Sequence, residues 1–158
     1  MKHLLLTTIA AVVLVGCGPS VPDISIHDAA FKGNIEAVKQ HLAAGVDVNA
    51  KDNAGGAPLI HAAWNDHKDT AELLIAKGAD VNAKNKKYGQ APLHIAAAHG
   101  YKEIAELLIA EGADVNANNN DSKTPLDLVA TWDLFGSTRS LLRKHGGKTG
   151  EELKAEGK

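Results

Sequence analysis

The feature that most constrains this chain is a short motif that recurs at a nearly constant spacing. GADVNA occupies residues 78–83 and 112–117, and GVDVNA, with one change, occupies residues 45–50. The three copies are therefore 33 and 34 residues apart. A period of this size indicates stacked structural units, each of which buries its apolar face only against its neighbours.

The third copy of the repeat predicts two short helices joined by a tight turn. Pro92 suits the first helical position, where its missing N–H costs nothing, and an apolar face follows over residues 93–97. Gly100 ends that helix. A second helix follows, with apolar residues at the i, i+3 and i+4 positions over residues 104–108, and Gly112 supplies a left-handed cap.

These residues resemble the ankyrin repeat, which combines a TPLH-type helix start, a double alanine, a glycine between two helices and GADVNA. The resemblance covers about four units from Ser25 to Gly146. It implies an all-α fold, an ankyrin-repeat solenoid of about four helix-turn-helix repeats with β-hairpin finger loops. The helix starts read APLI, APLH and TPLD, so Ala57 and Ala91 cannot cap their helices, and each lost cap costs about 0.5–2 kcal/mol.

Three departures from the repeat pattern predict local irregularities. Asp66 stands where the family has a glycine between the helices, and aspartate tolerates the left-handed conformation better than most residues. The second finger has one extra residue within residues 85–89, at a tip that touches solvent. The helix junction of the fourth unit, residues 134–137, is one residue longer than in the third.

The N-terminus predicts export and lipid attachment. A basic start is followed by a mostly apolar run over residues 4–15, which is too short to span a bilayer of about 30 Å. The run ends in Leu14-Val15-Gly16-Cys17, which resembles the lipobox of bacterial lipoproteins and implies acylation of Cys17. The alternatives are an ordinary signal peptide with an incidental thiol, or a short membrane anchor. With Gly18 instead of an aspartate after the cysteine, the resemblance to enteric lipoproteins implies the outer membrane over the inner one, with the protein facing the periplasm.

The sequence thus predicts a signal peptide at 1–16, an acylated cysteine with a short tether at 17–22, an ankyrin-repeat domain at 23–146 and a C-terminal capping helix at 147–158. Within the domain the repeats are placed at about 23–52, 53–85, 86–119 and 120–146. Thr149 and Glu152 predict a capping box for the last helix.

Composition and motifs argue against catalysis, cofactors and nucleic acid. The formal net charge is −2, which gives no basic face for nucleic acid. The eight histidines lack the i, i+4 spacing of helical metal ligands, and no nucleophile elbow, P-loop or dinucleotide fingerprint is present. We therefore predict a non-enzymatic monomer with no metal, cofactor or small-molecule substrate.

The remaining candidate is a protein-binding surface on the inner helices and finger loops. In ankyrin stacks the positions just after the double alanine face a concave groove, and here aromatic residues gather at them. The predicted partner-binding residues are Phe31, Trp64, His99 and Trp132 in the groove and Lys84, Lys86, Lys87 and Tyr88 on the second finger. Aromatic side chains are enriched at binding hot spots, so these residues suggest a partner with an apolar patch beside acidic groups.

Two other interpretations stay open at this point. Trp64 could pack on its own repeat and Trp132 could seal the C-terminal cap, so that neither serves recognition. The whole protein could also be a structural envelope tether without a selective groove, which would depend on Cys17 alone.

Overall fold

The computed structural model describes residues 22–129, 133 and 136–157, and these form stacked helix pairs. In these residues there is no β-strand, which confirms the predicted all-α stack of about four repeats. No helix in this part of the chain has the length and apolar character needed to cross a membrane. The helices are α1 (Ile26–Phe31), α2 (Ile35–Ala43), α3 (Pro58–Trp64), α4 (Lys68–Ala76), α5 (Pro92–His99), α6 (Lys102–Ala110), α7 (Pro125–Leu128), α8 (Ser137–Lys144) and α9 (Gly150–Ala155).

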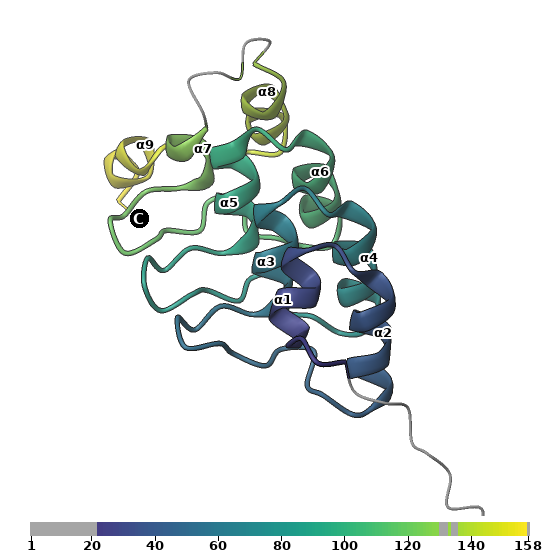
Figure 1. The fold of residues 1–158 in the computed structure, drawn as a ribbon. Coiled ribbons are helices and arrows are strands. Elements are labelled where there is room, and N and C mark those ends of the chain that lie inside the picture. Colours follow the sequence, from purple (N-terminus) through teal and green to yellow (C-terminus); the bar gives the residue numbers. More distant parts are fainter. Residues whose placement is uncertain (1–21, 130–132, 134–135, 158) are drawn as a thin grey trace, which may run out of the picture.

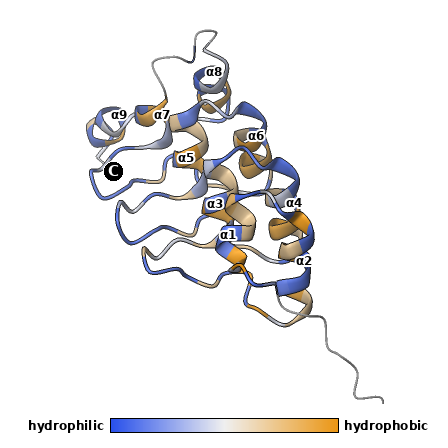
Figure 2. Ribbon diagram, viewed as in Figure 1, coloured by the Kyte–Doolittle hydropathy of each residue, from blue (hydrophilic) through white to orange (hydrophobic). Residues whose placement is uncertain are grey.

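The helices form two layers (Figure 1). The inner helices α1, α3, α5 and α7 pack on one another in order, and the outer helices α2, α4, α6 and α8 form the second layer. Finger loops leave the inner layer on the side away from the outer helices (Figure 1). Hydrophobic residues concentrate on the helices, whereas the fingers are mostly hydrophilic (Figure 2).

The core runs along the stack instead of filling a single centre. The double alanine of α1, Ala29 and Ala30, is fully buried, as are the matching pairs of α3 and α5, and these small side chains let successive inner helices approach closely. Larger side chains fill the space between the layers. They include Leu59, Leu93 and Leu126 from the inner helices and Val38, Leu74, Leu108 and Leu142 from the outer helices.

The inner helices begin as the sequence predicts. A proline occupies the start of α3, α5 and α7, and neither Ala57 nor Ala91 provides a side-chain cap. In α5 the backbone N–H of Ala91 instead donates to Nδ1 of the buried His94, at 3.2 Å. The Nε2–H of His94 donates to the carbonyl of Lys123 in the next repeat, also at 3.2 Å. The single retained motif histidine therefore links two repeats.

The turn within each pair requires a left-handed residue. Gly33 and Gly100 take this conformation between their helices, with φ of 66° and 72°. Asp66 does so in the second repeat with φ 57°, which confirms that the turn survives without glycine. Burial raises the pKa of the Asp66 carboxyl, and the neighbouring charge of Glu103 adds to this effect.

The fingers are hairpin loops without strands in the described residues. Each is closed by two backbone bonds at its tip, for example from the N–H of Asp52 to the carbonyl of Gly56 and from the N–H of Gly55 to the carbonyl of Asp52. Neighbouring fingers are joined by single backbone bonds, such as that from the N–H of Lys86 to the carbonyl of Ala54. These few turn bonds do not form a paired strand, so the expected β-hairpin character is limited to these contacts.

The recurring asparagine of the GADVNA motif ties each repeat to the next. Asn82 Nδ2 donates to the carbonyl of Gly112 at 3.2 Å, and its Oδ1 accepts from the N–H of Asp114 at 2.8 Å. Asn49 and Asn116 make the equivalent pair of contacts with the repeats that follow them. The sequence period is thus a period of inter-repeat hydrogen bonds.

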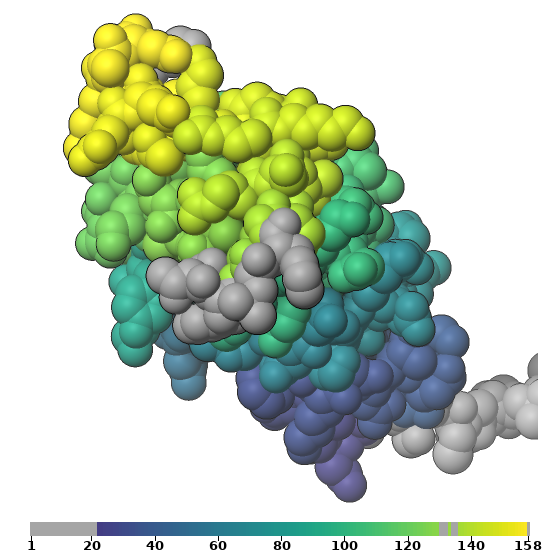
Figure 3. All heavy atoms as spheres, turned by 90° about the horizontal axis from the view of Figure 1, so that it is seen from above, coloured from purple at the N-terminus to yellow at the C-terminus, as the bar shows by residue number. Residues whose placement is uncertain are grey.

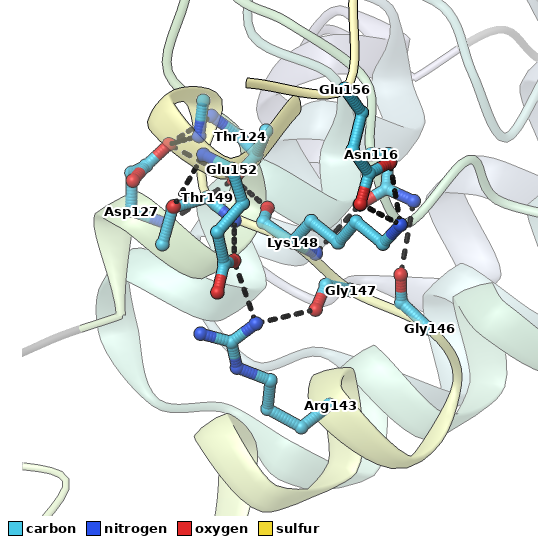
Figure 4. A network of polar contacts seen from close by, with 11 residues as sticks. Asn116, Thr124, Asp127, Arg143, Gly146, Gly147, Lys148, Thr149, Glu152 and Glu156 are labelled. Atoms are coloured by element: carbon cyan, nitrogen blue, oxygen red, sulfur yellow. Dashed lines mark hydrogen bonds and ion pairs between the residues drawn. The ribbon is translucent and has the colours of Figure 1, made fainter. Parts of the chain in front are cut away.

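Polar contacts close the C-terminal end of the stack (Figure 4). Asp127 Oδ2 accepts from the N–H of Thr124 at 2.9 Å and from the N–H of Gly150 at 2.8 Å, joining α7 to α9. The predicted capping box of Thr149 and Glu152 is present at the start of α9. The C-terminal residues cover the end of the stack opposite to the first repeat (Figure 3).

The fourth repeat is the most irregular one. Its inner helix α7 spans only four residues, fewer than α3 or α5. Asp133 caps the following helix, because its carboxylate accepts from the N–H groups of Ser137, Thr138 and Arg139 at 3.0–3.1 Å. An acidic group at a helix start also interacts favourably with the helix dipole.

Candidate functional site

Two large aromatic side chains are exposed at equivalent positions of the first two repeats. Phe31 is the last residue of α1 and Trp64 the last residue of α3, and each follows the buried double alanine of its helix. Their exposed fractions are 45% and 43%. The third repeat has Ala98 at this position, so the aromatic character ends there.

Phe31 and Trp64 line one pocket of about 220 Å³ where the inner helices meet the fingers. Two further residues of α3, three residues of the first finger and one residue of the second finger complete it. They are Ile60, His61, Asp52, Ala54, Gly56 and Asn85. The lining is mostly apolar, with Asp52, His61 and Asn85 as its polar members.

A hydrogen bond between Asp52 and His61 positions the His61 ring that contacts Phe31. The Phe31 ring meets the His61 ring edge to face, with centroids 6.4 Å apart. His61 Nε2–H donates to Asp52 Oδ2 at 2.8 Å, and the N–H of Gly56 donates to Asp52 Oδ1 at 2.7 Å. Burial acts to raise the pKa of Asp52, but the bonds from Gly56 and His61 outweigh it and hold the pKa below its usual range. Asp52 therefore stays ionised and fixes His61.

Two aromatic residues of the third repeat, His99 and Tyr101, restrain the Trp64 ring. The Trp64 ring meets the His99 ring at 5.1 Å with an interplanar angle of 64°, and His99 stacks on Tyr101 at 5.3 Å with an angle of 14°. Such offset and edge-to-face contacts restrict the ring without burying its outer face. Trp64 is thus exposed and restrained at the same time.

The second finger carries a cluster of lysines beside this pocket. Asn85 of the finger lines the pocket, and the next residue, Lys86, bonds through its N–H to Ala54, which also lines it. Lys87 Nζ lies 4.8 Å from the centroid of the Tyr88 ring. The Tyr88 side chain is 47% exposed.

The family model that matches the sequence is described as "Ankyrin repeats (3 copies)" and covers residues 26–119 and 83–149. These two matches extend over most of the chain. The chain belongs to the ankyrin-repeat family. Ankyrin repeats act in protein–protein interaction and are typically non-catalytic.

The relatives of this ankyrin protein match only part of its chain. It is 38% identical over 77 residues to the mitochondrial disaggregase of Homo sapiens, covering 47% of this chain and 11% of that protein. It is 39% identical over 61 residues to the human protein phosphatase 1 regulatory subunit 27, covering 39% of this chain and 40% of that protein. The chain therefore spans well under half the length of either relative.

The ankyrin stack brings several of the predicted site residues together. Phe31 and Trp64 share the pocket, and His99 supports Trp64 from behind. Lys84 instead reaches toward the third finger, where its Nζ donates to the carbonyl of Asn118 at 2.6 Å. Lys86, Lys87 and Tyr88 lie on the second finger, while Trp132 and the lipidation candidate Cys17 lie outside the described residues.

Sequence reasoning missed the polar members of the pocket. Asp52 and His61 lie nine residues apart on a finger and a helix, and their pairing depends on how the finger folds back. The one available signal was the displaced histidine, because Ile60 occupies the position where the ankyrin motif places its histidine and His61 follows it. Within the described ranges, no group of three or more metal-ligating side chains comes together.

Proposed function

We propose that this ankyrin-repeat protein is a non-enzymatic interaction module, held at a bacterial cell envelope by a lipid on Cys17, that binds one partner protein through its groove and fingers. The observation that carries the binding proposal is the exposure of Phe31 and Trp64 on a restrained scaffold. Exposed aromatic side chains that share a pocket mark interaction sites more often than singly scattered ones do.

The scaffold supports recognition with little rearrangement. Phe31 is flanked by the Asp52–His61 pair, and Trp64 by the stacked rings of His99 and Tyr101. Aromatic side chains that are already restrained lose little conformational entropy when a partner covers them. Rigid docking then needs no large movement of the backbone.

The binding proposal is tested by crosslinking and affinity capture from detergent-solubilised membranes. The wild-type chain is compared with a Phe31→Ala, Trp64→Ala variant and with a control variant, Gln40→Ala, Glu111→Ala, whose changes lie on the outer side. We expect one protein to be retained by the wild type and the control and lost with the groove variant. Equal capture by all three, or none, would favour the structural tether without a selective groove.

The anchoring proposal rests on the sequence that ends in Cys17. A Cys17→Ser change should release the protein from the membrane fraction and abolish labelling by a radioactive fatty acid. Fractionation of inner and outer membranes tests the proposed outer-membrane location. Retention of the Cys17→Ser protein in membranes at the wild-type level would reject the lipid anchor while leaving the groove proposal untouched.

A further inference from the structure

The pocket at Phe31 and Trp64 has the size of a site for one side chain. Its volume of about 220 Å³ lies below the roughly 300–1,000 Å³ that is usual for small-molecule sites. A helix, about 10–12 Å in diameter with its side chains, does not fit inside it. An apolar side chain projecting from a protein surface or an extended segment does fit, because the pocket walls are mostly apolar.

Charge next to the pocket is distributed unevenly. The second finger contains Lys84, Lys86 and Lys87 and no acidic residue over residues 83–90. Among the residues that the structure describes, none of these three lysines forms an ion pair. The outer helices differ, because each of α2, α4 and α6 pairs a lysine with a glutamate of the same helix. Those pairs are Lys39–Glu36, Lys68–Glu72 and Lys102–Glu106.

Lys86 of the second finger lies close enough to the pocket to act together with it. The stem of Lys86 covers Gly55 so closely that a Cβ on Gly55 would lie 2.4 Å from Lys86 Cγ. Gly55 is the neighbour of two pocket residues, Ala54 and Gly56. A group that enters the pocket therefore has the side chain of Lys86 close beside it.

One rim of the pocket includes the carboxylate of Asp52. Asp52 belongs to the first finger, and its carboxylate is occupied by His61 and by the N–H of Gly56. An acidic partner residue is repelled from this rim and attracted to the second finger. The arrangement thus orients a ligand along the stack.

Resting on the proposed protein-binding function, we infer that the pocket receives one large apolar side chain from an acidic segment of the partner. Carboxylates next to that side chain lie against Lys86 and Lys87, toward the third repeat. The apolar side chain supplies the anchor, and the carboxylates supply orientation and a faster association that weakens with salt.

The test is selection of binders from a displayed library of random short peptides against the full chain in detergent. Enriched peptides should share an aromatic or long aliphatic residue with Asp or Glu close by. Trp64→Ala should weaken their binding by about 10-fold or more. Lys86→Glu with Lys87→Glu should weaken it by a similar factor that shrinks at high salt. The charge-matched control, Lys77→Glu with Lys144→Glu on the outer side, should bind as the wild type does.

The other outcomes separate this inference from the proposed function. Peptides that lack acidic residues, or that tolerate the lysine reversal but need Trp64, would overturn the acidic partner and leave groove recognition standing. No enriched peptides, or binding that is indifferent to Trp64→Ala, would overturn both. A fluorescent single-stranded oligonucleotide is assayed in parallel. Its binding, if lost with the lysine reversal but kept in Trp64→Ala, would identify a general polyanion surface and overturn the inference.

Discussion

The groove of the first two repeats and the C-terminal end of the stack are two surfaces of the same helical array that differ in chemistry. In the groove, Phe31 and Trp64 remain nearly half exposed although each ring is restrained by its neighbours. At the C-terminal end, the carboxylates of Asp127 on α7 and Glu152 on α9 accept hydrogen bonds from backbone N–H groups. The C-terminal end suits contact with water, and the groove suits the proposed partner.

This difference indicates that the repeat scaffold and the proposed binding surface depend on different residues. The double alanines, the prolines and the GADVNA asparagines recur and hold the stack together. The residue just after the double alanine varies, from Phe31 to Trp64 to Ala98. Because that position contributes little to the core, the chain can place a binding residue there without a large loss of stability.

The largest expected effect concerns the closed end. Asp127→Ala removes the acceptor for the N–H groups of Thr124 and Gly150, and Gly150 is buried. Leaving buried donors unpaired and losing a helix cap should lower the free energy of unfolding by about 2–3 kcal/mol. Urea unfolding measures this change. Asp121→Ala, an exposed change on the adjacent finger, serves as the control and should cost less than about 0.5 kcal/mol.

The next effect is the pH dependence of stability that His94 contributes through its link to the following repeat. Burial lowers the pKa of His94 below its ordinary value of 6.5, more than the carbonyls of Lys123 and Ala117 raise it. The unfolded chain therefore binds a proton more readily than the folded one, and stability should fall as the pH drops below about 6.5. The slope from one such group is at most about 1.4 kcal/mol per pH unit.

His94→Gln tests this account, because glutamine keeps a donor and an acceptor but does not titrate. Unfolding measured between pH 7.5 and pH 5, about the ordinary range of histidine, should be less pH-dependent in the variant. Thr124, whose hydroxyl donates to the carbonyl of Lys148 at 2.7 Å, makes the corresponding link at the closed end without titrating. An unchanged pH dependence in His94→Gln would contradict this account.

A smaller effect is expected in the groove. Trp64→Ala should lower the free energy of unfolding by only about 1 kcal/mol, since a half-exposed side chain contributes roughly half of the 1.5–3 kcal/mol of a fully buried one. Leu74→Ala, at a fully buried position of α4, is the comparison and should cost about 2–5 kcal/mol. Equal losses in the two variants would assign Trp64 to the core.

The smallest expected effect lies in the exposed ion pair of the closed end. Arg143 donates to Glu152 at 2.7 Å, and this bond together with the N–H of Thr149 lowers the pKa of Glu152 to about 2 from an ordinary 4.5. The contribution of Glu152 is therefore complete above pH 4.5 and is lost as the pH falls from 4.5 toward 2.

Glu152→Gln should flatten acid unfolding within that window and change little at neutral pH, because the pair is exposed to solvent and salt. Circular dichroism across an acid titration measures the difference. A variant profile that overlays the wild type in this window would show that the pair contributes nothing.

Much of the fold follows from the sequence because each repeat contains the residues that begin its helices and form its turns. Pro92, Gly100 and Gly112 mark the start, the turn and the end of one unit, and the spacing repeats them. Even Asp66 could be assigned a left-handed turn from its position and side chain. Two details could not be read from the repeat, namely the short helix α7 and the absence of strands from the described fingers, because both depend on local backbone bonding.

The groove could be predicted only in part. The column that follows the double alanine identifies Phe31 and Trp64 as neighbours in space. The Asp52–His61 pair and the wall formed by Asn85 depend on how two fingers fold back on the helices, and no pattern in the sequence encodes this. Ion pairing follows more directly from the sequence, since the outer helices place lysine and glutamate three or four residues apart and residues 83–90 contain no acidic residue.

The most direct test of the groove as the partner site is site-specific photocrosslinking in producing cells. A photoreactive phenylalanine analogue replaces Phe31 in the groove, Gln40 on the outer layer or Lys154 on α9. We predict one discrete crosslinked protein from position 31 that disappears when Trp64→Ala is added, and none from positions 40 and 154. The same product from all three positions, or no product from position 31, would contradict the groove as the binding surface.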